Sequence, residues 1–138
     1  MRVDYDYLHD LLKVFIEQEK AVLTYKDFSE YSAKDLQKFC LHMKLLSDQG
    51  LVANVIKDSS ELGIKFDLND GGYYLIEAPW RLTSQGYDFA ATLTKPELFA
   101  LVRDRMKNDG ISAVVDISKG FAKKKLEQLL EEYFNTDV

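Results

Sequence analysis

The sequence predicts a mainly α-helical protein with a small β-hairpin, an α+β fold class, and three observations carry that prediction. Apolar residues recur at helical spacing over three long segments: 4–20, 32–50 and 112–134. Two strand-like segments, 51–56 and 73–83, flank the strong turn signal "NDGG". The composition, 46% hydrophobic and 30% charged over 138 residues, is that of a globular chain that needs no disulfide or metal to fold.

The first helix is expected over residues 4–20. Its apolar side chains share one stripe at helical spacing: Tyr5, Leu8, Leu12, Phe15 and Ile16. Asp4 can cap this helix, because a carboxylate accepts hydrogen bonds from the free amide groups of the first turn. One short helix is expected over residues 26–31.

The clearest helix covers residues 32–50. Ser32 is its expected N-cap, Asp35 supports the first turn as in a capping box, and Gly50 stands where a helix ends with a positive φ. One face carries the residues expected in the core: Leu36, Phe39, Cys40, Met43 and Leu46. The other side carries Lys34, Gln37, Lys38, Leu41 and Leu45. Two leucines one turn apart on that side indicate a cover, either the C-terminal helices or a partner chain.

Two main strands are expected to pair antiparallel, 51–56 with 73–83. Residues 64–68 alternate in polarity and are expected to pair back through the turn at 69–72. Pro79 has no amide hydrogen, so the strand that contains it is either an edge strand or bulged at that point.

A short helix is expected over residues 84–93, capped by Thr83 or Ser84. Gly86 in its first turn allows a neighbouring element to approach closely, because glycine has no Cβ.

Two longer helices end the chain. The first covers 96–109, with Thr94 as N-cap and Gly110 as the residue that closes it. The second covers 112–134 and has a long apolar stripe: Val114, Ile117, Phe121, Leu126, Leu129, Leu130 and Tyr133. A helix this long cannot bury its stripe on itself. We therefore expect it to pack partly on the preceding helix and partly across a two-fold homodimer interface.

The composition bounds the function. Cys40 is the only cysteine, which excludes an internal disulfide and a zinc site of paired cysteines. The N-terminal segment lacks the apolar run of a signal peptide, and no run approaches the roughly 20 residues of a membrane span, so we expect a cytoplasmic protein with no membrane partner. No catalytic constellation, metal-ligand cluster or phosphate-binding loop stands out, so neither an enzyme nor a cofactor is expected.

The order helix, short element, helix, strand, turn, strand, helix is that of a winged helix-turn-helix domain. The stretch "CLHMKLLSDQGLV" resembles the end of a recognition helix in that family, and "YYLIEAPWRLTSQGYDF" resembles its second wing strand with the joint to the next helix. We therefore expect a winged-helix domain over 1–93 and two additional C-terminal helices over 94–138, for packing or dimerisation.

The chain also resembles a phage-associated family, domain of unknown function 2513. An N-terminal helix that opens with acidic residues carries this resemblance, together with "LHMKLLSDQGLV", "RLTSQGYDFAATL" and "LVRDRMKNDGISAVVDISKGFAKKKLEQLL". These pieces cover most of the chain beyond residue 35. The resemblance brings no activity with it.

The winged-helix resemblance implies a DNA-binding or regulatory module, phage or mobile-element associated, with double-stranded DNA as the partner. The candidate contacts lie on the outward helix face, the wing and the second strand: Lys34, Gln37, Lys38, Leu41, Leu45, Lys57, Lys65 and Arg81. The alternative is a protein-interaction module, an adaptor or inhibitor, on the same scaffold without DNA binding. A net charge of −5, the outward leucines and a long, acidic wing at 56–72 favour this alternative.

Overall fold

The computed structural model describes residues 1–57 and 61–135. That part of the chain folds into six α-helices, one 3-10 helix and four short strands. The predicted mainly α, α+β fold class is confirmed. Over the same residues, none of the helices combines the length and the apolar character that crossing a membrane requires.

Helical segments make up about the first third of the chain: α1 (Tyr5–Glu17), η1 (Tyr25–Phe28), α2 (Ser29–Ser32) and α3 (Leu36–Asp48). Asp4 caps α1 as predicted, accepting a hydrogen bond from the Tyr7 amide at 3.1 Å. The prediction that Ser32 caps α3 is wrong. Residues 29–32 form a helical turn of their own, and the chain becomes extended only at Asp35 (φ −151°, ψ 92°) before α3 begins.

Four strands form two separate antiparallel pairs: β1 (Val52–Asn54) with β4 (Trp80–Leu82), and β2 (Ile64–Asp67) with β3 (Gly72–Leu75). In the first pair Val52 lies opposite Leu82 and Asn54 opposite Trp80. The backbone of Leu23 bridges the other side of Trp80, through hydrogen bonds of 2.9 and 2.6 Å.

The predicted return of residues 64–68 through the "NDGG" turn is confirmed by the β2–β3 hairpin. The prediction of one continuous strand over 73–83 is wrong, because residues 76–79 are irregular. Pro79 lies in this break and cannot donate to a ladder, and its carbonyl instead accepts the Val55 amide at 3.0 Å. The pairing of 51–56 with 73–83 is therefore confirmed only over the three residues of β1 and β4.

Three helices complete the chain: α4 (Ser84–Leu93), α5 (Pro96–Arg105) and α6 (Ile111–Asn135). Thr83 caps α4, accepting the Gly86 amide at 3.0 Å. The prediction of Thr94 as the N-cap of α5 is wrong: Thr94 ends α4, with its hydroxyl donating to the Ala90 carbonyl, and Lys95 precedes α5 without a side-chain cap. The first of the two C-terminal helices, α5, ends at Arg105, earlier than the expected residue 109.

One hydrophobic core joins these elements. Its most buried large side chains include Phe28 of η1, Trp80 of β4, Leu93 of α4 and Leu98 of α5. The first half of α6 extends the same cluster with Ile111, Val114 and Val115. The core therefore runs across the predicted boundary at residue 93.

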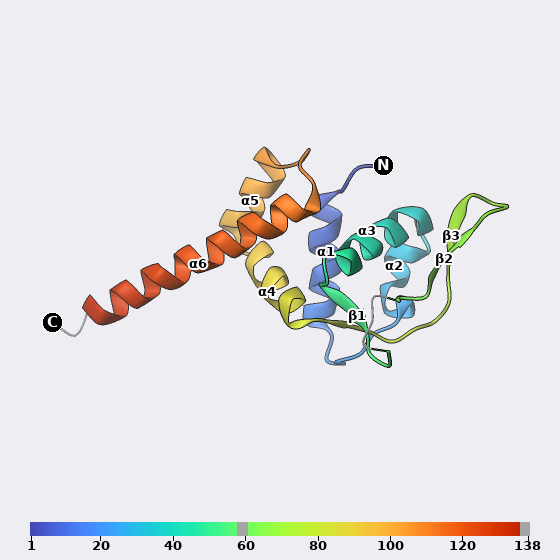
Figure 1. Cartoon of the computed structure of the whole chain (residues 1–138), viewed down its shortest axis with the longest axis horizontal. Coiled ribbons are helices and arrows are strands. Elements are labelled where there is room, and N and C mark those ends of the chain that lie inside the picture. The colour runs from blue at the N-terminus through green and yellow to red at the C-terminus, as the bar shows by residue number, and fades with distance from the viewer. Residues whose placement is uncertain (58–60, 136–138) are drawn as a thin grey trace.

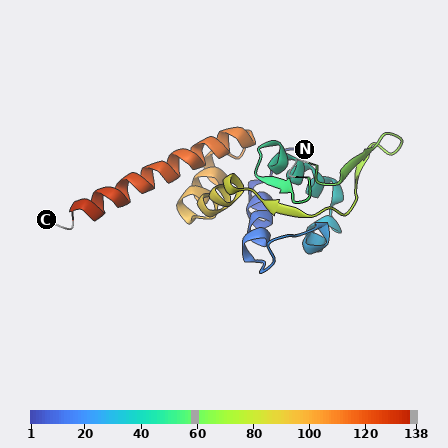
Figure 2. The same cartoon turned by 60° about the horizontal axis from the view of Figure 1, so that its bottom comes forward.

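Two elements project from this core at opposite ends. Figure 1 shows the β2–β3 hairpin extending on one side and α6 on the other. The turned view of Figure 2 shows the same arrangement, with the C-terminal half of α6 far from the other helices. Each projecting element presents side chains that the core does not cover.

Candidate partner-binding surface

The candidate surface consists of α3 and the β2–β3 hairpin that lies against it. Lys34 precedes the helix and is exposed, because α3 begins only after the Asp35 cap. The Asp35 carboxylate accepts the Lys38 amide at 3.1 Å, which orients the first turn of the helix. Lys34 therefore stands outside α3 rather than within its first turns.

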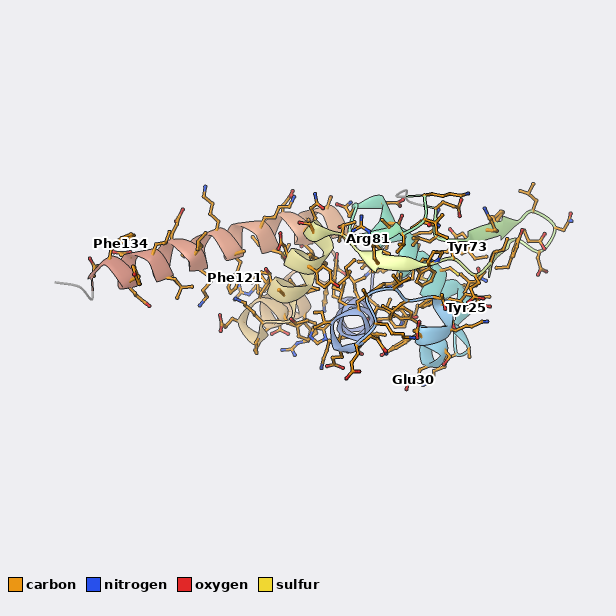
Figure 3. All side chains as sticks on the ribbon, turned by 90° about the horizontal axis from the view of Figure 1, so that it is seen from below. Tyr25, Glu30, Tyr73, Arg81, Phe121 and Phe134 are labelled. Carbon is orange, nitrogen blue, oxygen red and sulfur yellow. The ribbon has the colours of Figure 1, made fainter. Side chains whose placement is uncertain are left out.

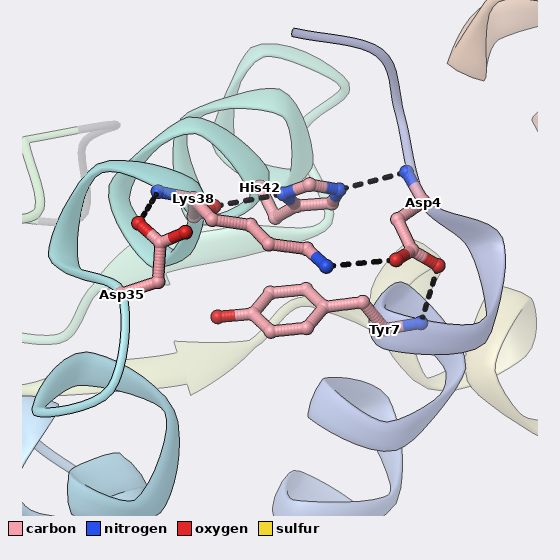
Figure 4. A network of polar contacts seen from close by, with 5 residues as sticks. All are labelled: Asp4, Tyr7, Asp35, Lys38 and His42. Carbon is pink, nitrogen blue, oxygen red and sulfur yellow. Dashed lines mark hydrogen bonds and ion pairs between the residues drawn. The ribbon is translucent and has the colours of Figure 1, made fainter.

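Lys38 is turned toward α1 (Figure 4). Its Nζ lies 2.8 Å from Oδ2 of Asp4 and 4.6 Å from the centroid of the Tyr7 ring. An ammonium group held by a carboxylate and an aromatic face at once has two intramolecular partners. The assignment of Lys38 to an outward, DNA-facing position is therefore wrong, because the ion pair binds this side chain to the N-terminus of α1.

His42 completes the same network. It is fully buried, and its Nε2 accepts the Asp4 backbone amide at 2.9 Å. Its Nδ1 lies 2.8 Å from the Lys38 carbonyl, to which the protonated Nδ1 of the neutral tautomer donates. Both ring nitrogens are thus used inside the protein. This geometry is that of a structural histidine.

The electrostatics of the network favour a neutral imidazole next to a charged carboxylate. Burial lowers the pKa of His42 below 6.5, because an imidazolium would lose its hydration. Burial alone would raise the pKa of Asp4, but the hydrogen bonds from Lys38 and from the Tyr7 amide outweigh it, so the pKa is lowered. The network therefore clamps α1 to α3 at neutral pH through a partly exposed ion pair and a buried imidazole.

Gln37 binds the hairpin to α3. Its Oε1 accepts the Tyr73 amide at 2.8 Å, and its Nε2 donates to the Tyr73 carbonyl at 3.1 Å. The side-chain amide thus pairs with an outward-facing peptide unit of β3 much as a neighbouring strand would. Gly72 leaves room for this contact, since a Cβ there would lie 3.1 Å from Gln37 Nε2. Gln37 is consequently occupied within the chain.

The hairpin exposes large apolar side chains. Phe66 is 54% exposed, Leu68 88%, Tyr74 46% and Ile76 51%. Phe66 and Tyr73 face each other across the strands, with ring centroids 5.9 Å apart in an edge-to-face arrangement. Exposed apolar side chains gathered on one small element are typical of interaction sites. Figure 3 places Tyr73 where the hairpin meets the body of the protein.

The remaining predicted residues are scattered. Leu41 is half-buried, and Leu45 packs against the core, so the protein itself covers Leu45. Lys57 is exposed at the start of the wing. Lys65 pairs with Glu61 at 3.3 Å, and a guanidinium nitrogen of half-buried Arg81 lies 3.3 Å from the Leu82 carbonyl. The structure therefore does not bring the predicted residues together into one basic face.

Two features of this surface were not predicted. Nothing local in the sequence signals that Asp4, besides capping α1, binds a lysine 34 residues away. The apolar residues of the hairpin did have a signal, since hydrophobic residues recur through "IKFDLNDGGYYLI" on both sides of the turn. That pattern predicts strand pairing but does not by itself indicate a contact surface.

Other candidate sites offer fewer groups suited to binding or catalysis. A groove of about 400 Å³ lies between α4, α6 and the end of α3, and Gln49, Asp88, Asp116 and Lys119 are among its lining residues. Burial raises the pKa of the Cys40 thiol to about 11, so this cysteine stays protonated at neutral pH. Over residues 1–57 and 61–135, no three His, Cys, Asp or Glu side chains are grouped so that they could hold a metal ion.

Comparison of the chain with models of known protein families, with curated proteins and with solved structures gave no match. The surface is therefore interpreted from its own geometry and charge.

Proposed function

We propose that this chain is a protein-interaction module built on a winged-helix scaffold, in which the β2–β3 hairpin and the adjoining face of α3 bind a protein partner. The order of elements supports the scaffold: helices precede α3, and β1, the hairpin and β4 follow it. The bridge from Leu23 to Trp80 adds a third strand segment beside β4 and β1. A phage or mobile-element origin belongs to the same proposal.

The charge of the hairpin is the observation that carries this function. Residues 61–77, which comprise the hairpin and its two flanks, contain four carboxylates, Glu61, Asp67, Asp70 and Glu77, against the single ammonium group of Lys65, which gives a net charge of −3. Glu61 is paired with Lys65 and Glu77 with Lys26, so Asp67 and Asp70, near the turn, are the carboxylates outside these ion pairs. A wing that flanks DNA lies close to phosphates, and these two carboxylates would be repelled there. Beside the apolar residues of the hairpin, the same charge suits a basic protein partner.

The partner expected for this surface has an apolar patch ringed by Lys or Arg. Phe66 and Leu68 would fill the apolar centre, and Asp67 and Asp70 beside them would meet the basic rim. Tyr74 lies on the other face of the hairpin, opposite Lys65, and would contact the edge of the partner. Because Gln37 holds β3 on α3, the hairpin is already placed, and little ordering would be needed on binding.

A photo-crosslinking experiment tests the proposal. A photoreactive phenylalanine at position 68 should crosslink one protein in the native host, whereas the same group at Tyr87 should not. Tyr87 is also exposed but lies on α4. Binding of the purified partner should then weaken at least about tenfold in a Phe66→Asp, Tyr74→Asp variant and stay unchanged in Tyr87→Asp. If the hairpin variant binds the partner as tightly as the wild type, the assignment of this surface is wrong.

Double-stranded DNA is the second candidate, and one observation favours it. Lys34, just before α3, and Lys44, on α3, are exposed and form no ion pair within residues 1–57 and 61–135. With Lys57, three lysines could reach phosphates, so the slope of log affinity against log salt should be no steeper than about −3 per chain.

Fluorescence anisotropy with a random duplex at low salt distinguishes the two candidates. The protein-interaction proposal expects weak binding or none. Tight binding that is lost in a Lys34→Glu, Lys44→Glu variant would favour the DNA module. Lys38→Glu is unsuitable for this test, because that substitution also breaks the ion pair with Asp4.

A further inference from the structure

The C-terminal half of α6 presents a second apolar surface, unconnected to the hairpin. In the first half of the helix, Ile111, Val114, Val115 and Ser118 are buried, and α6 packs there on α4 and α5. Beyond Phe121 the helix leaves the body of the protein, and Figure 3 shows Phe134 near its far end, away from the core. About 15 residues, or roughly 22 Å of helix, extend in this way.

Five large apolar side chains lie along this projecting half. Leu126, Leu129, Leu130, Tyr133 and Phe134 are between 47% and 67% exposed. They stand at i, i+3, i+4, i+7 and i+8, so all five lie along one side of the helix. Leu126 and Leu129, with Ala122 before them, have the 4-3 spacing of a coiled-coil seam.

The charges on this half are segregated along the helix. Lys123, Lys124 and Lys125 precede the leucines, and Glu127, Glu131 and Glu132 lie among and after them. Two parallel copies would place lysines beside lysines and glutamates beside glutamates. Two antiparallel copies that cross near Gln128 would place Lys125 of each copy, which flanks the seam, beside Glu132 of the other, whereas Lys124 and Glu131 lie on the side of the helix away from the seam. Lys125 also forms an ion pair with Glu97 at 3.3 Å, and both side chains are largely exposed. Because such a surface pair is weak, it would not prevent Lys125 from contacting the second copy.

The area is suited to a second copy. The exposed leucines, Phe134 and the side-chain stems beside them offer on the order of 600 Å² per chain, close to the roughly 800 Å² per partner of a standard interface. An anionic membrane surface fits less well, because Glu127, Glu131 and Glu132 would face the lipid headgroups.

We propose that the C-terminal half of α6 is a self-association surface on which a second copy of this chain lies antiparallel, crossing near Gln128. The two-fold axis makes the contact isologous, so the pair of Lys125 with Glu132 of the second copy forms twice. The predicted homodimer thereby gains a defined surface and a defined orientation.

Sedimentation equilibrium on charge-reversed full-length chains tests the orientation. Lys125→Glu should raise the dimer dissociation constant about tenfold, and so should Glu132→Lys, because each places like charges together at both symmetry-related contacts. The variant that carries both substitutions should dimerise to within about threefold of the wild type, since it exchanges the two signs. A parallel dimer would respond differently, because its like charges already face each other and neither reversal would weaken it.

Disulfide trapping gives an independent readout of the same geometry. In the antiparallel arrangement two Leu129→Cys chains meet close to the crossing point and should crosslink. Two Tyr133→Cys chains would lie about 16 Å apart along the axis and should not. Cys40 is fully buried and does not interfere. Three outcomes overturn the proposal: a monomer at high micromolar concentration with native helix content, equal crosslinking at both positions, or association only with anionic vesicles.

Discussion

Replacing Gly86 by alanine probes the close approach of the first turn of α4 to the chain that enters β1. A Cβ at position 86 would lie well inside van der Waals contact of the Leu51 carbonyl oxygen, 3.0 Å from its carbon and 3.1 Å from Cδ2 of Leu82. The first of these neighbours is backbone and cannot rotate away. To make room, the first turn of α4 would have to move away from the chain entering β1.

The magnitude follows from three contributions. Forced overpacking against backbone costs about 3 kcal/mol. The same displacement stretches the hydrogen bond from the Thr83 amide to the Leu51 carbonyl, 2.9 Å in the native chain, at a cost of about 1 kcal/mol. Alanine in place of glycine within a helix returns about 1 kcal/mol. The net loss is about 3 kcal/mol, which lowers the melting temperature of a chain of this size by about 10 °C.

Thermal and urea unfolding followed by circular dichroism measure this effect, with Gly120→Ala as the matched control. Gly120 also lies within a helix, but nothing stands within 4 Å of a Cβ placed there. The same substitution should therefore stabilise the protein by up to about 1 kcal/mol at position 120 and destabilise it at position 86. A Gly86→Ala chain as stable as the wild type would refute the inferred close packing of α4 on the strands.

Three further predictions concern the contacts of α3. His42 has a lowered pKa in the folded protein, so the unfolded chain takes up its proton first; the free energy of unfolding should fall as the pH drops below about 6.5, and much less so in His42→Gln. Lys38→Met should cost about 1 kcal/mol in urea unfolding, a value discounted for the partial exposure of its ion pair with Asp4. Gln37→Ala should accelerate hydrogen exchange of the Tyr73 amide without unfolding the protein, because it removes that amide's hydrogen-bond acceptor.

Matched variants identify the outcomes that would contradict these predictions. Lys44→Met changes an exposed lysine of the same helix that forms no ion pair within the described residues. If this variant loses as much stability as Lys38→Met, the ion pair with Asp4 does not explain the effect at Lys38. Gln85→Ala changes an exposed glutamine on α4 and should leave the Tyr73 amide protected. A pH profile of stability that is the same with and without His42 would show that the loss at low pH has another source.

Much of the local structure was predictable, because its causes lie within a few residues. Asp4 and Thr83 cap helices by accepting amide hydrogens of the following turn. Gly50 ends α3 with a φ of 70°, which favours glycine. The α3 start was mispredicted because Ser32 and Asp35 are both competent caps. Because Ser32 is the last residue of the short helix α2, Asp35 is the residue that caps α3.

The candidate surfaces depend on contacts that no local pattern contains. Lys38 stands on the expected helix, but its ammonium group pairs with a carboxylate 34 residues earlier. Gln37 pairs with a peptide unit 36 residues later. Both side chains have the spacing of an outward face, and only the packing of α1 and the hairpin around α3 determines that they are engaged within the chain.

The apolar stripe of α6 shows most clearly what the sequence determines and what only the tertiary structure decides. Its helical period alone determined that residues 112–134 form a helix with one hydrophobic side. Periodicity cannot state how far along that side other helices reach, because this depends on where α4 and α5 end in space. The tertiary structure decided that Val114 and Val115 are buried while Leu129 and Leu130 remain exposed, since the body of the protein stops before the second half of α6 begins.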